Sequence, residues 1–506
     1  MNGKKVFGDY QTPYDFAQKV CKLINYKYQR PLTVLEPTCG IGSFLKASLL
    51  FNAQIYYGIE INPLYCKQCK LQFTDERIKI INADIFNYDL KSLLHNLDEI
   101  LVIGNPPWVT NSDLSKQNAT NVPHKANIKA LNGFAAITGA SNFDICEYII
   151  LQMIELIQEK KSILAMLCKT SVARNVFKEL NRRNIKYNTF SIYKFNAQKV
   201  FNIGAAACLL AIEFNYSDDN IQKPCDIYDF ENFESPIERL NYSNGEIFNL
   251  SLSDENFSGK SCFEWRQGVK HDCSKVMELS FDGNCFINGN NEKVDIEKEY
   301  VFPLIKSSMF KKAIINVFSK YVIVTQTKIK EDTQPIKNIA PKTWQYLYKH
   351  LENFEKRKSS IYKNSPLFSM FGIGDYSFAK YKIGISGFYK NPFFALLDGR
   401  NKPIMTDDTS YFITFDNYDM AYMAMLCLNN KKVNKYLTQI SFQDAKRPYT
   451  KQILNNLDFE KIVNAISFSD IIQTETGLEL QRYAQMSMYD DFKRYIKEKS
   501  NTRNSF

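Results

Sequence analysis

The sequence predicts an α/β fold with an open, mostly parallel sheet in its N-terminal part, followed by a second domain of mixed α and β structure. Strand-like runs recur near the N-terminus at intervals that leave room for a helix between them. Each of these runs ends in an acid or an amide, which is typical of strands that carry a ligand site at their carboxyl ends. At 506 residues the chain is too long for one hydrophobic core, so two or three domains are expected.

The four runs follow one another in a regular order. The first, LTVLEPTCGIGSFL, has a β-rich start that ends at Glu36, then a glycine-bearing turn and a helix start. After 24 residues YYGIEINP reaches Glu60, and after the same interval IKIINADIFNYD reaches Asp84. The fourth run, EILVIGNPPW, reaches Asn105. Because the carboxyl ends of parallel strands meet at one edge of the sheet, we expect these four side chains to form one site.

The turn after the first strand indicates what kind of ligand this site takes. Gly40 and Gly42 allow positive φ and a close approach of the backbone to a ligand. A pyrophosphate-binding fingerprint has a third glycine, whereas here an acid, Glu36, opens the turn, and a carboxylate repels phosphate. The turn therefore favours a cationic nucleoside that bears an amino acid, with Glu60 placed for a ribose diol and Asp84 for an exocyclic amine. For the glycine pair alone, a tight structural turn without a ligand is an equal alternative.

The motifs FGDYQTP, EPTCGIG, GIEINP, NADIF and NPPW, in this order, resemble the γ group of class I S-adenosylmethionine-dependent DNA adenine-N6 methyltransferases from restriction-modification systems. The resemblance covers residues 7–215 and implies a doubly wound, seven-stranded, mostly parallel sheet. It implies a catalytic domain over 1–230 and a DNA target-recognition domain over 231–506. The implied reaction transfers a methyl group from S-adenosylmethionine to N6 of an adenine that is rotated out of double-stranded DNA.

The same resemblance implies a cofactor site for S-adenosylmethionine. Glu36 would face the methionine ammonium, Glu60 would bind the ribose hydroxyls, and Asp84 would accept a hydrogen bond from the cofactor adenine. Cys39 departs from the family pattern, which often has Ala or Ser there. The implied cofactor-binding residues are Phe7, Thr12, Pro13, Glu36, Pro37, Cys39, Gly40, Gly42, Glu60, Ile61, Asp84, Ile85, Phe86 and Asn105.

The NPPW motif explains how an adenine amine would react. Adenine N6 is a poor nucleophile because its lone pair is delocalised into the ring, and two acceptors on its N–H bonds would aim that pair at the methyl group. The Asn105 side-chain oxygen and the Pro106 carbonyl are the two acceptors, and the prolines add stiffness without competing donors. Trp108 offers a ring face for stacking, worth about 1–3 kcal/mol per base, where the family usually has Tyr or Phe. The implied catalytic residues are Asn105, Pro106, Pro107, Trp108 and Phe201, the last as a clamp on the base.

Charge is concentrated in the second part of the chain. The net charge is +10, and residues 311–390 hold 15 Lys and Arg against 5 Asp and Glu, interleaved with 14 aromatic side chains. A basic, aromatic-rich module is typical of polyanion binding, although a solvated lysine-rich surface is the alternative. Double-stranded DNA is the expected partner. The candidate DNA contacts are Lys116, Lys125, Lys356, Arg357, Lys358, Tyr362, Lys446 and Arg447.

Other functions stay open at the level of sequence. The acceptor of the methyl group is alternatively another planar amine or amide, such as an RNA base, a protein glutamine or cytosine N4, and the chain is alternatively a non-catalytic DNA-binding specificity subunit. A large basic C-terminal domain favours DNA among these. No nuclease motif of the P-D…E-x-K type is present, so DNA cleavage is expected to be the task of a separately encoded restriction endonuclease.

The remaining sequence features argue against a metal or a membrane. Cys66-x-x-Cys69 has no second pair at ligand spacing and only four histidines are present, so we expect a structural thiol pair and no metal. No apolar run reaches 18 residues, and the N-terminus lacks the apolar stretch of a secretory signal. Scattered cysteines suit a reducing compartment, so we expect a bacterial or archaeal cytoplasmic protein that acts at the nucleoid. The segment WRQGVKHDCSKVMEL (265–279) combines a glycine turn with mixed charges, and the sequence suggests no role for it.

Overall fold

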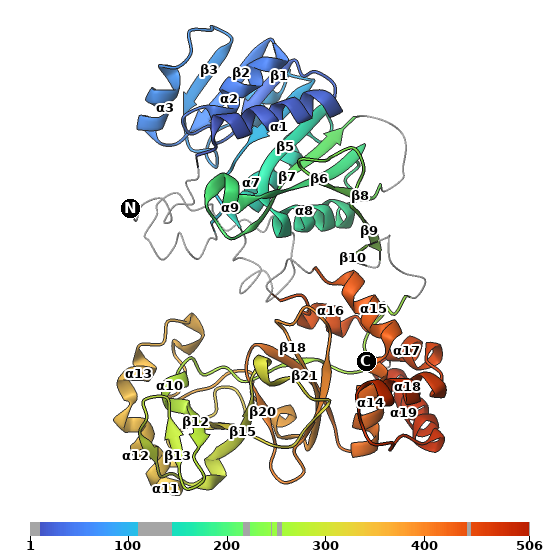
Figure 1. Cartoon of the computed structure of the whole chain (residues 1–506). Coiled ribbons are helices and arrows are strands. Elements are labelled where there is room, and N and C mark those ends of the chain that lie inside the picture. Colours follow the sequence, from blue (N-terminus) through green and yellow to red (C-terminus); the bar gives the residue numbers. More distant parts are fainter. Residues whose placement is uncertain are drawn as a thin grey trace. The chain divides into compact units, whose positions relative to one another are not determined.

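The chain folds into two compact units, Met1–Ser251 and Leu252–Phe506, which are described separately (Figure 1). The predicted boundary, after residue 230, falls between two strands of the first unit's sheet. A computed structural model of the chain describes residues 11–109, 144–215, 223–243, 245–249, 256–442 and 447–504.

A ten-stranded sheet forms the centre of the first unit, in the order β10-β9-β8-β6-β7-β5-β4-β1-β2-β3. The pairs β1–β2, β1–β4, β2–β3 and β4–β5 are parallel. Strands β1 and β4 are buried along their whole length, which is why β4 reads as a continuous apolar run rather than as an alternating one. The strands are β1 Thr33–Glu36, β2 Ile55–Glu60, β3 Ile78–Asn82, β4 Ile100–Gly104, β5 Ser162–Lys169, β6 Thr189–Asn196, β7 Ala206–Phe214, β8 Cys225–Asp229, β9 Glu238–Ser243 and β10 Glu246–Asn249.

Helices connect these strands as crossovers. From the centre of the sheet the chain order β1, β2, β3 runs in one direction and β4, β5 follow in the other, so right-handed crossovers place α2 and α3 on one face and α7 on the opposite face. The predicted α/β class with a doubly wound sheet is confirmed. The helices are α1 Tyr14–Lys27, α2 Ser43–Ser48, η1 Leu49–Phe51, α3 Pro63–Lys70, α4 Leu90–Leu94, α7 Ile145–Ile157, α8 Thr170–Arg182 and α9 Ala197–Phe201.

The number of strands predicted for this sheet, seven, is wrong. Beyond the seven strands β1 to β7, strand β8 pairs parallel with β6, and the hairpin of β9 and β10 continues antiparallel from β8. These three strands come from residues 225–249, which follow the stretch that carries the family motifs. Strand β8 pairs the backbone groups that β6 would otherwise leave open at the edge of the sheet.

The second unit contains two smaller sheets, in the orders β11-β21-β18-β19-β16 and β14-β13-β12-β17-β15-β20. Most of their strand pairs are antiparallel, but β15–β20 and β16–β19 are parallel. The strands are β11 Arg266–Gln267, β12 Glu278–Phe281, β13 Phe286–Asn288, β14 Lys293–Val294, β15 Val301–Ile305, β16 Ile314–Ile315, β17 Lys320–Ile323, β18 Tyr381–Ser386, β19 Phe394–Asp398, β20 Met405–Thr406 and β21 Ser410–Phe415.

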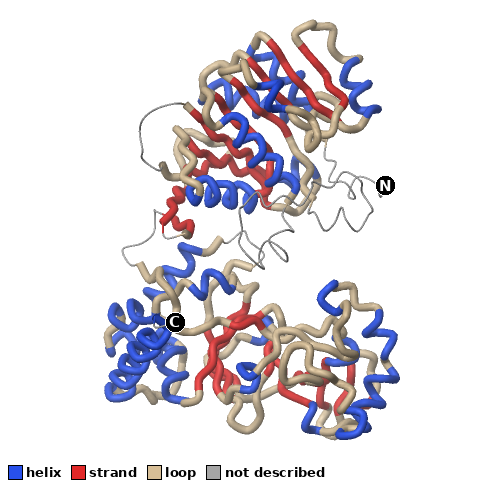
Figure 2. The backbone as a smooth tube through the Cα atoms, turned by 180° about the vertical axis from the view of Figure 1, so that it is seen from behind, coloured by secondary structure: helices blue, strands red, loops and turns tan. Residues whose placement is uncertain are grey.

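Helices lie at both ends of these sheets, with α11 to α13 at one end and α14, α17, α18 and α19 at the other (Figure 2). Helix α14 is apolar around most of its circumference because it packs between α18, α19 and the strands β18, β19 and β21. Within the described ranges, none of the helices combines the length and the apolar character that a bilayer crossing requires. The helices are α10 Ser274–Met277, η2 Lys298–Tyr300, η3 Ser307–Met309, α11 Ile336–Ile339, α12 Pro341–Lys349, α13 Leu351–Glu355, η4 Ser360–Tyr362, η5 Asp375–Phe378, α14 Tyr418–Asn429, α15 Lys431–Ile440, α16 Lys451–Asn455, α17 Phe459–Ala465, α18 Phe468–Gly477 and α19 Met486–Asn504.

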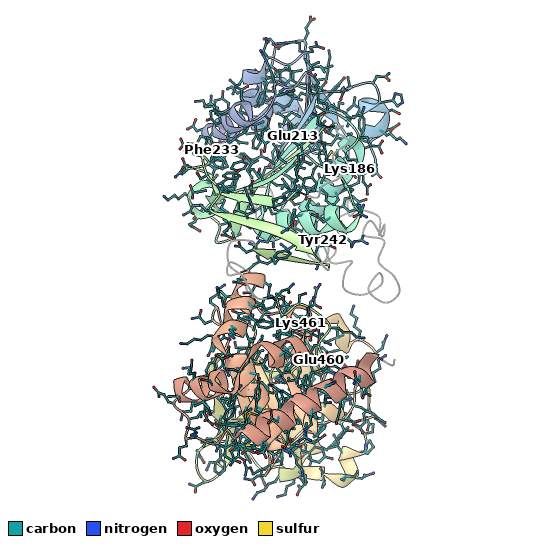
Figure 3. The ribbon with its side chains drawn as sticks, turned by 90° about the vertical axis from the view of Figure 1, so that its right-hand side faces the viewer. Lys186, Glu213, Phe233, Tyr242, Glu460 and Lys461 are labelled. Atoms are coloured by element: carbon teal, nitrogen blue, oxygen red, sulfur yellow. The ribbon has the colours of Figure 1, made fainter. Side chains whose placement is uncertain are left out.

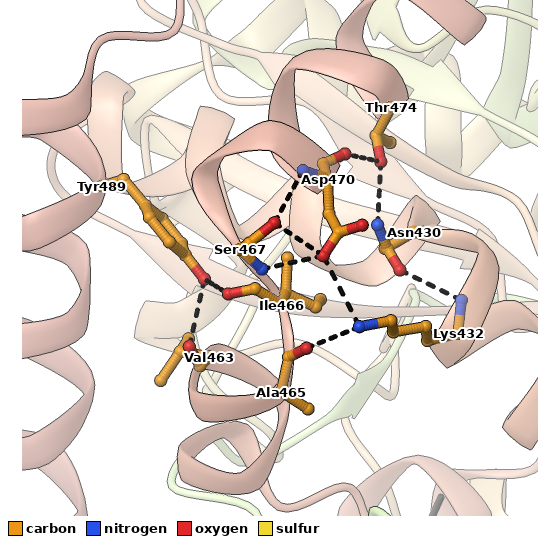
Figure 4. A network of polar contacts seen from close by, with 9 residues as sticks. All are labelled: Asn430, Lys432, Val463, Ala465, Ile466, Ser467, Asp470, Thr474 and Tyr489. Carbon is orange, nitrogen blue, oxygen red and sulfur yellow. Dashed lines mark hydrogen bonds and ion pairs between the residues drawn. The ribbon is translucent and has the colours of Figure 1, made fainter. Parts of the chain in front are cut away.

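A polar network holds the C-terminal helices of this unit together (Figure 4). The Lys432 ammonium donates to the Ala465 carbonyl at 2.8 Å and lies 3.5 Å from the Asp470 carboxylate. The Asn430 amide donates to the Thr474 hydroxyl at 3.1 Å. The start of α15 is thereby joined to the end of α17 and to α18 through both charged and neutral groups.

The beginning of the second unit is built into the same helices. Lys461, which Figure 3 labels, lies in α17 and donates to the Ser258 carbonyl at 2.6 Å. The Gly259 N–H donates to the Asn456 carbonyl at 2.9 Å. Ser258 and Gly259, near the start of the second unit, are therefore joined to α17 and to the end of α16.

A lysine is buried inside this unit. Lys382, in β18, is 1% exposed, and its side-chain nitrogen donates to the carbonyls of Ser377 at 2.9 Å, Ala379 at 3.3 Å and Ile404 at 2.7 Å. Burial lowers the pKa of Lys382 from its ordinary 10.5 to about 7. Between these two values the unfolded chain binds a proton that the folded chain has lost, so this lysine makes stability rise with pH.

We expect the Lys382→Met variant to lack this rise. The free energy of unfolding of the wild type, minus that of the variant, should increase between about pH 7 and pH 10 by up to a few kcal/mol, since each pKa unit corresponds to about 1.4 kcal/mol. Urea unfolding of both full-length proteins across this range measures the difference. A difference that does not change with pH would show that the lysine stays charged between its three carbonyl partners.

Candidate active site

A pocket of about 370 Å³ opens in the first unit at the carboxyl ends of β1, β2 and β4. Its volume lies within the range of roughly 300–1,000 Å³ that small-molecule sites occupy. The location is the topological switch point of the sheet, because β1 has β2 on one side and β4 on the other. The predicted residues that line the pocket are Thr12, Glu36, Pro37, Cys39, Gly40, Glu60, Ile61, Asp84, Ile85, Phe86, Asn105 and Pro107.

Several predicted residues are not part of the pocket wall. Pro13 is exposed at the start of α1, Gly42 is buried at the end of the loop after β1, and Pro106 is buried beside the pocket. Phe7 lies outside the described residues. The pocket wall also contains residues that the sequence did not single out, among them Gln11, Thr38, Asn62, Tyr65, Val109 and Ile149.

The loop after β1 has a conformation that requires glycine. Gly40 and Gly42 have φ values of +52° and +88°, in the left-handed region. A Cβ on Gly40 would lie 2.5 Å from Gln11 Oε1, and one on Gly42 would lie 2.6 Å from Cys69 Sγ. The loop is thus packed closely between Gln11 and Cys69 of α3.

The acids at the strand ends organise this loop. Glu60 accepts from the N–H groups of Gly40 at 2.8 Å and Asn62 at 2.7 Å, so it joins the turn after β1 to the turn after β2. Glu36 is 3% exposed and accepts from the Leu45 N–H at 3.0 Å, at the start of α2. Burial raises the pKa of Glu36 well above its usual value.

The polar groups of the pocket fit S-adenosylmethionine. The Thr38 hydroxyl oxygen is buried and has no hydrogen-bond partner among the described residues, so it is available to a ligand. A cationic amino group would offset the cost of ionising Glu36 in its buried position. The departure at Cys39 is accommodated, since its thiol is 3% exposed and its N–H donates to the Ile59 carbonyl at 2.8 Å. When bound, the cofactor would supply the reactive methyl group.

Because Glu36 has a raised pKa, we expect cofactor binding to depend on pH. A cationic amino group needs the ionised carboxylate, so binding at a pH below the pKa of Glu36 in the free protein must release its proton. Cofactor affinity should therefore fall by up to about tenfold per pH unit as the pH drops below that pKa. Calorimetry of S-adenosylmethionine binding between about pH 5 and pH 8, in buffers of different ionisation enthalpy, measures both affinity and proton release.

The matched control is the Glu36→Gln variant, which keeps the shape of the side chain but has no proton to release. It should bind the cofactor more weakly near neutral pH and without the acid-dependent loss. If the wild type and Glu36→Gln lose cofactor affinity in parallel as the pH falls, the pH dependence comes from a group other than Glu36.

The NPPW turn follows β4 directly and is held by hydrogen bonds from residues that the sequence analysis did not single out. The Lys169 ammonium, at the end of β5, donates to the Trp108 carbonyl at 3.4 Å and to the Asp144 carboxylate at 2.6 Å. The Ile145 N–H donates to the Val109 carbonyl at 2.9 Å. Asp144 caps α7, so an acid before an apolar helical run was the available sequence signal. The turn is held between the end of β5 and the start of α7.

Trp108 and Phe201 are brought together beside the turn. Trp108 is 7% exposed, and its indole N–H donates to the Leu167 carbonyl at 3.3 Å. Its ring meets that of Phe201 edge to face, with centroids 5.6 Å apart. The rings contact each other directly, so a base clamped between them would require Phe201 to move.

The predicted DNA contacts fall into two groups. Lys356 and Lys358 are exposed. Arg357 is half-buried, donates to the carbonyls of His271 at 3.3 Å and Ser369 at 2.7 Å, and stacks over the Tyr362 ring at 3.7 Å. Burial lowers the pKa of Arg357. Its guanidinium is bonded within the protein, which is typical of an arginine that stabilises the fold. Arg447 lies over the Phe388 ring, and Lys116, Lys125 and Lys446 lie outside the described residues.

Among the residues that the structure describes, no group of three or more His, Cys, Asp or Glu side chains could hold a metal ion. Cys66 and Cys69 are both buried in α3.

A comparison of sequences identifies the family. No protein-family model matches the chain. The Type II methyltransferase M.NspV from Nostoc sp. (strain ATCC 29411 / PCC 7524) is 40% identical to it over 475 residues, which are 92% of this chain and 98% of that protein. The chain belongs to the Type II methyltransferase family. Membership in this family confirms the predicted resemblance to restriction-modification methyltransferases, and the cofactor of this Type II methyltransferase is S-adenosylmethionine.

Solved structures resemble this Type II methyltransferase only distantly. The M protein of the Type I restriction enzyme EcoKI is 16% identical, with a TM-score of 0.29 over 44% of this chain and 48% of that protein. M. capricolum TrmK in complex with S-adenosyl-homocysteine is 13% identical, with a TM-score of 0.26 over 42% of this chain and 73% of that protein. The family assignment therefore depends on the sequence match to M.NspV.

Proposed function

We propose that this methyltransferase transfers the methyl group of S-adenosylmethionine to N6 of an adenine that is rotated out of double-stranded DNA. It acts as the modification enzyme of a restriction-modification or related system, and DNA cleavage belongs to a separately encoded endonuclease. Membership in the Type II methyltransferase family supports both the reaction class and the biological setting.

One observation carries the proposal. Asn105 and Pro107, from the NPPW turn, line the same pocket as the three acids Glu36, Glu60 and Asp84. A carboxamide that accepts hydrogen bonds from an amine thus faces the space in which the cofactor's cationic and nucleoside parts fit. Transfer between two bound groups needs proximity and orientation, which a stiff turn at a fixed strand end provides.

The residues of the turn have defined roles in this reaction. The Asn105 side-chain oxygen and the Pro106 carbonyl accept hydrogen bonds from the two N–H bonds of the adenine amine and direct its lone pair at the methyl carbon. The new N–C bond forms as the S–C bond breaks, and the sulfur keeps that electron pair. One N–H proton then leaves to water. No strong base is needed, because nitrogen loses its proton only after it has become positively charged.

A duplex substrate explains why a second unit is present. Rotating a base out of the helix costs a few kcal/mol, and phosphate and base contacts elsewhere must supply this free energy. The basic stretch 311–390 belongs to the second unit and is suited to that task.

The proposal is tested with purified protein, labelled S-adenosylmethionine and unmethylated bacterial DNA. Digestion to nucleosides and mass spectrometry identify the modified base, and N6-methyladenine is the expected product. Total RNA and glutamine-containing peptides serve as competing acceptors. N4-methylcytosine, transfer to RNA or peptide instead of DNA, or cofactor binding without transfer to any acceptor would each overturn the proposal.

A further inference from the structure

The second unit contains a polar cleft of its own, with a volume of about 670 Å³. It lies where the chain passes between the two sheets of this unit, because the connections β11–β12, β15–β16 and β20–β21 each run from one sheet to the other. These connections supply wall residues within 269–278, 306–308 and 407–409, and residues 356–358 after α13 together with Phe388 complete the wall. The cleft is thus assembled from segments that are far apart in the sequence.

The first of these connections gives a structural account of the segment 265–279. Trp265 is fully buried in the core, and the backbone then passes very close to the β20–β21 connection. A Cβ on Gly268 would lie 2.2 Å from the carbonyl oxygens of Thr406 and Asp407, and one on Gly372 would lie 2.3 Å from the Gly268 carbonyl oxygen. These close backbone contacts fix the position from which the following side chains enter the cleft.

Charges of both signs stand next to one another in the cleft. The Lys270 ammonium lies 3.2 Å from the Asp272 carboxylate and 3.6 Å from the Asp408 carboxylate. Lys306 pairs with Glu278 at 2.8 Å. The side chains of Lys270, Asp272 and Asp408 are 35%, 31% and 32% exposed, so a ligand can reach donors and acceptors side by side.

The mixture of signs indicates which part of DNA this cleft contacts. A surface that binds only phosphates has no use for carboxylates, because they repel the ligand. Base edges in the major groove present both kinds of group, so a carboxylate accepts from cytosine N4 and a lysine donates to guanine O6 and N7. Ser308 is exposed in the same wall and supplies a hydroxyl that suits either kind of edge, whereas the hydroxyls of Ser307 and Thr409 bond each other. Lys356 and Lys358 are exposed and suit phosphates, and the acid that pairs with Lys356 is the exposed Glu352 of α13, outside the cleft wall.

We propose that Lys270, Asp272 and Asp408 contact base edges of the recognition sequence and so determine which site is methylated. Lys356 and Lys358 hold the neighbouring phosphates. This inference rests on the proposed DNA methyltransferase function and goes beyond it by assigning the specificity of the reaction to named side chains.

The experiment uses the full chain and a pool of duplexes with a randomised central region. Single-molecule sequencing of the methylated pool defines the wild-type motif and its selectivity at each position. In the Lys270→Met and Asp408→Asn variants, discrimination at one or two base pairs should fall by roughly 5- to 150-fold, which corresponds to the 1–3 kcal/mol of a specific base contact. Variants at an exposed ion pair of the same unit, Lys342→Met and Asp295→Asn, should keep the motif unchanged.

Two results would overturn the inference. The first is an unchanged motif in both cleft variants. The second is a uniform change in their affinity for all duplexes, which is the result expected of phosphate contacts alone. By contrast, Lys356→Glu with Lys358→Glu should weaken binding of every duplex and reduce the slope of log affinity against log salt by about one per lost phosphate contact. If the wild type methylates none of the duplexes, the proposed function itself is refuted. The outcomes above differ from this one, because they are seen in variants of an active wild type. Thermal unfolding and cofactor affinity of each variant show that the chain is folded.

Discussion

The Asn105→Ala variant is expected to lose at least two orders of magnitude in kcat for methyl transfer while its affinity for S-adenosylmethionine stays within a few-fold of the wild type. Removing one polar group that acts on the reacting centre typically costs about 10²–10³ in rate. Asn105 lines the pocket at the end of β4, whereas the acids expected to bind the cofactor stand on other strands. Single-turnover transfer at saturating DNA and cofactor measures the chemical step, and calorimetry measures cofactor binding.

Asn105→Asp is the matched control, since it keeps an oxygen acceptor of similar size at the same place. Rates should follow the order Asn, Asp, Ala, because acceptance of the amine's hydrogen bonds is the property that matters. Transfer by Asn105→Ala at the wild-type rate would reject the mechanism, whatever the affinity of the variant for the cofactor.

Trp108→Ala should lower turnover on DNA by roughly 5- to 150-fold, the equivalent of the 1–3 kcal/mol that stacking contributes for each base. The indole is not part of the pocket wall, so the affinity for S-adenosylmethionine should change little. The variant should also be less stable, because a buried ring that contacts Phe201 and the Leu167 carbonyl is lost, which typically costs about 3–5 kcal/mol.

The Trp108→Phe variant separates stacking from packing. It keeps an aromatic face but cannot donate to Leu167, so it should retain most of the turnover and lose less stability than the alanine variant. Turnover, cofactor affinity and thermal unfolding are measured for both variants. A loss of cofactor affinity without a loss of turnover at saturating cofactor would place the indole in the cofactor site instead.

Much of the site follows from local sequence patterns. A polar residue at the end of a strand or just after it lies at the carboxyl edge of a parallel sheet, which is why Glu36, Glu60, Asp84 and Asn105 could be grouped from the sequence alone. The glycine loop could also be predicted from the sequence, since positive φ at Gly40 and Gly42 suits no other residue well. These predictions depend on backbone geometry within a few residues.

Other features depend on contacts between distant segments and carry little local signal. Lys169 looks like an ordinary surface lysine in the sequence, but at the end of β5 it reaches the carbonyl of Trp108 and the carboxylate of Asp144. Arg357 looks like part of a basic run suited to phosphates, but its neighbours in space are backbone carbonyls and the Tyr362 ring. Strands β8, β9 and β10 extend the first sheet beyond β6, so that its edge lies at β10, and only the pairing of these strands shows it.

By itself, the order of residues along the chain determined the α/β class, the place of the nucleoside pocket and the chemistry of its walls, because these depend on strand ends and turns that each span a few residues. Only the tertiary structure showed that Lys169 and Arg357 bond groups within the protein, and at which strand the first sheet ends. It also showed that Lys270 and Asp408 share one cleft. The physical reason is that burial, pairing of charges and closure of a sheet edge depend on which distant segments meet, and composition and spacing do not report that.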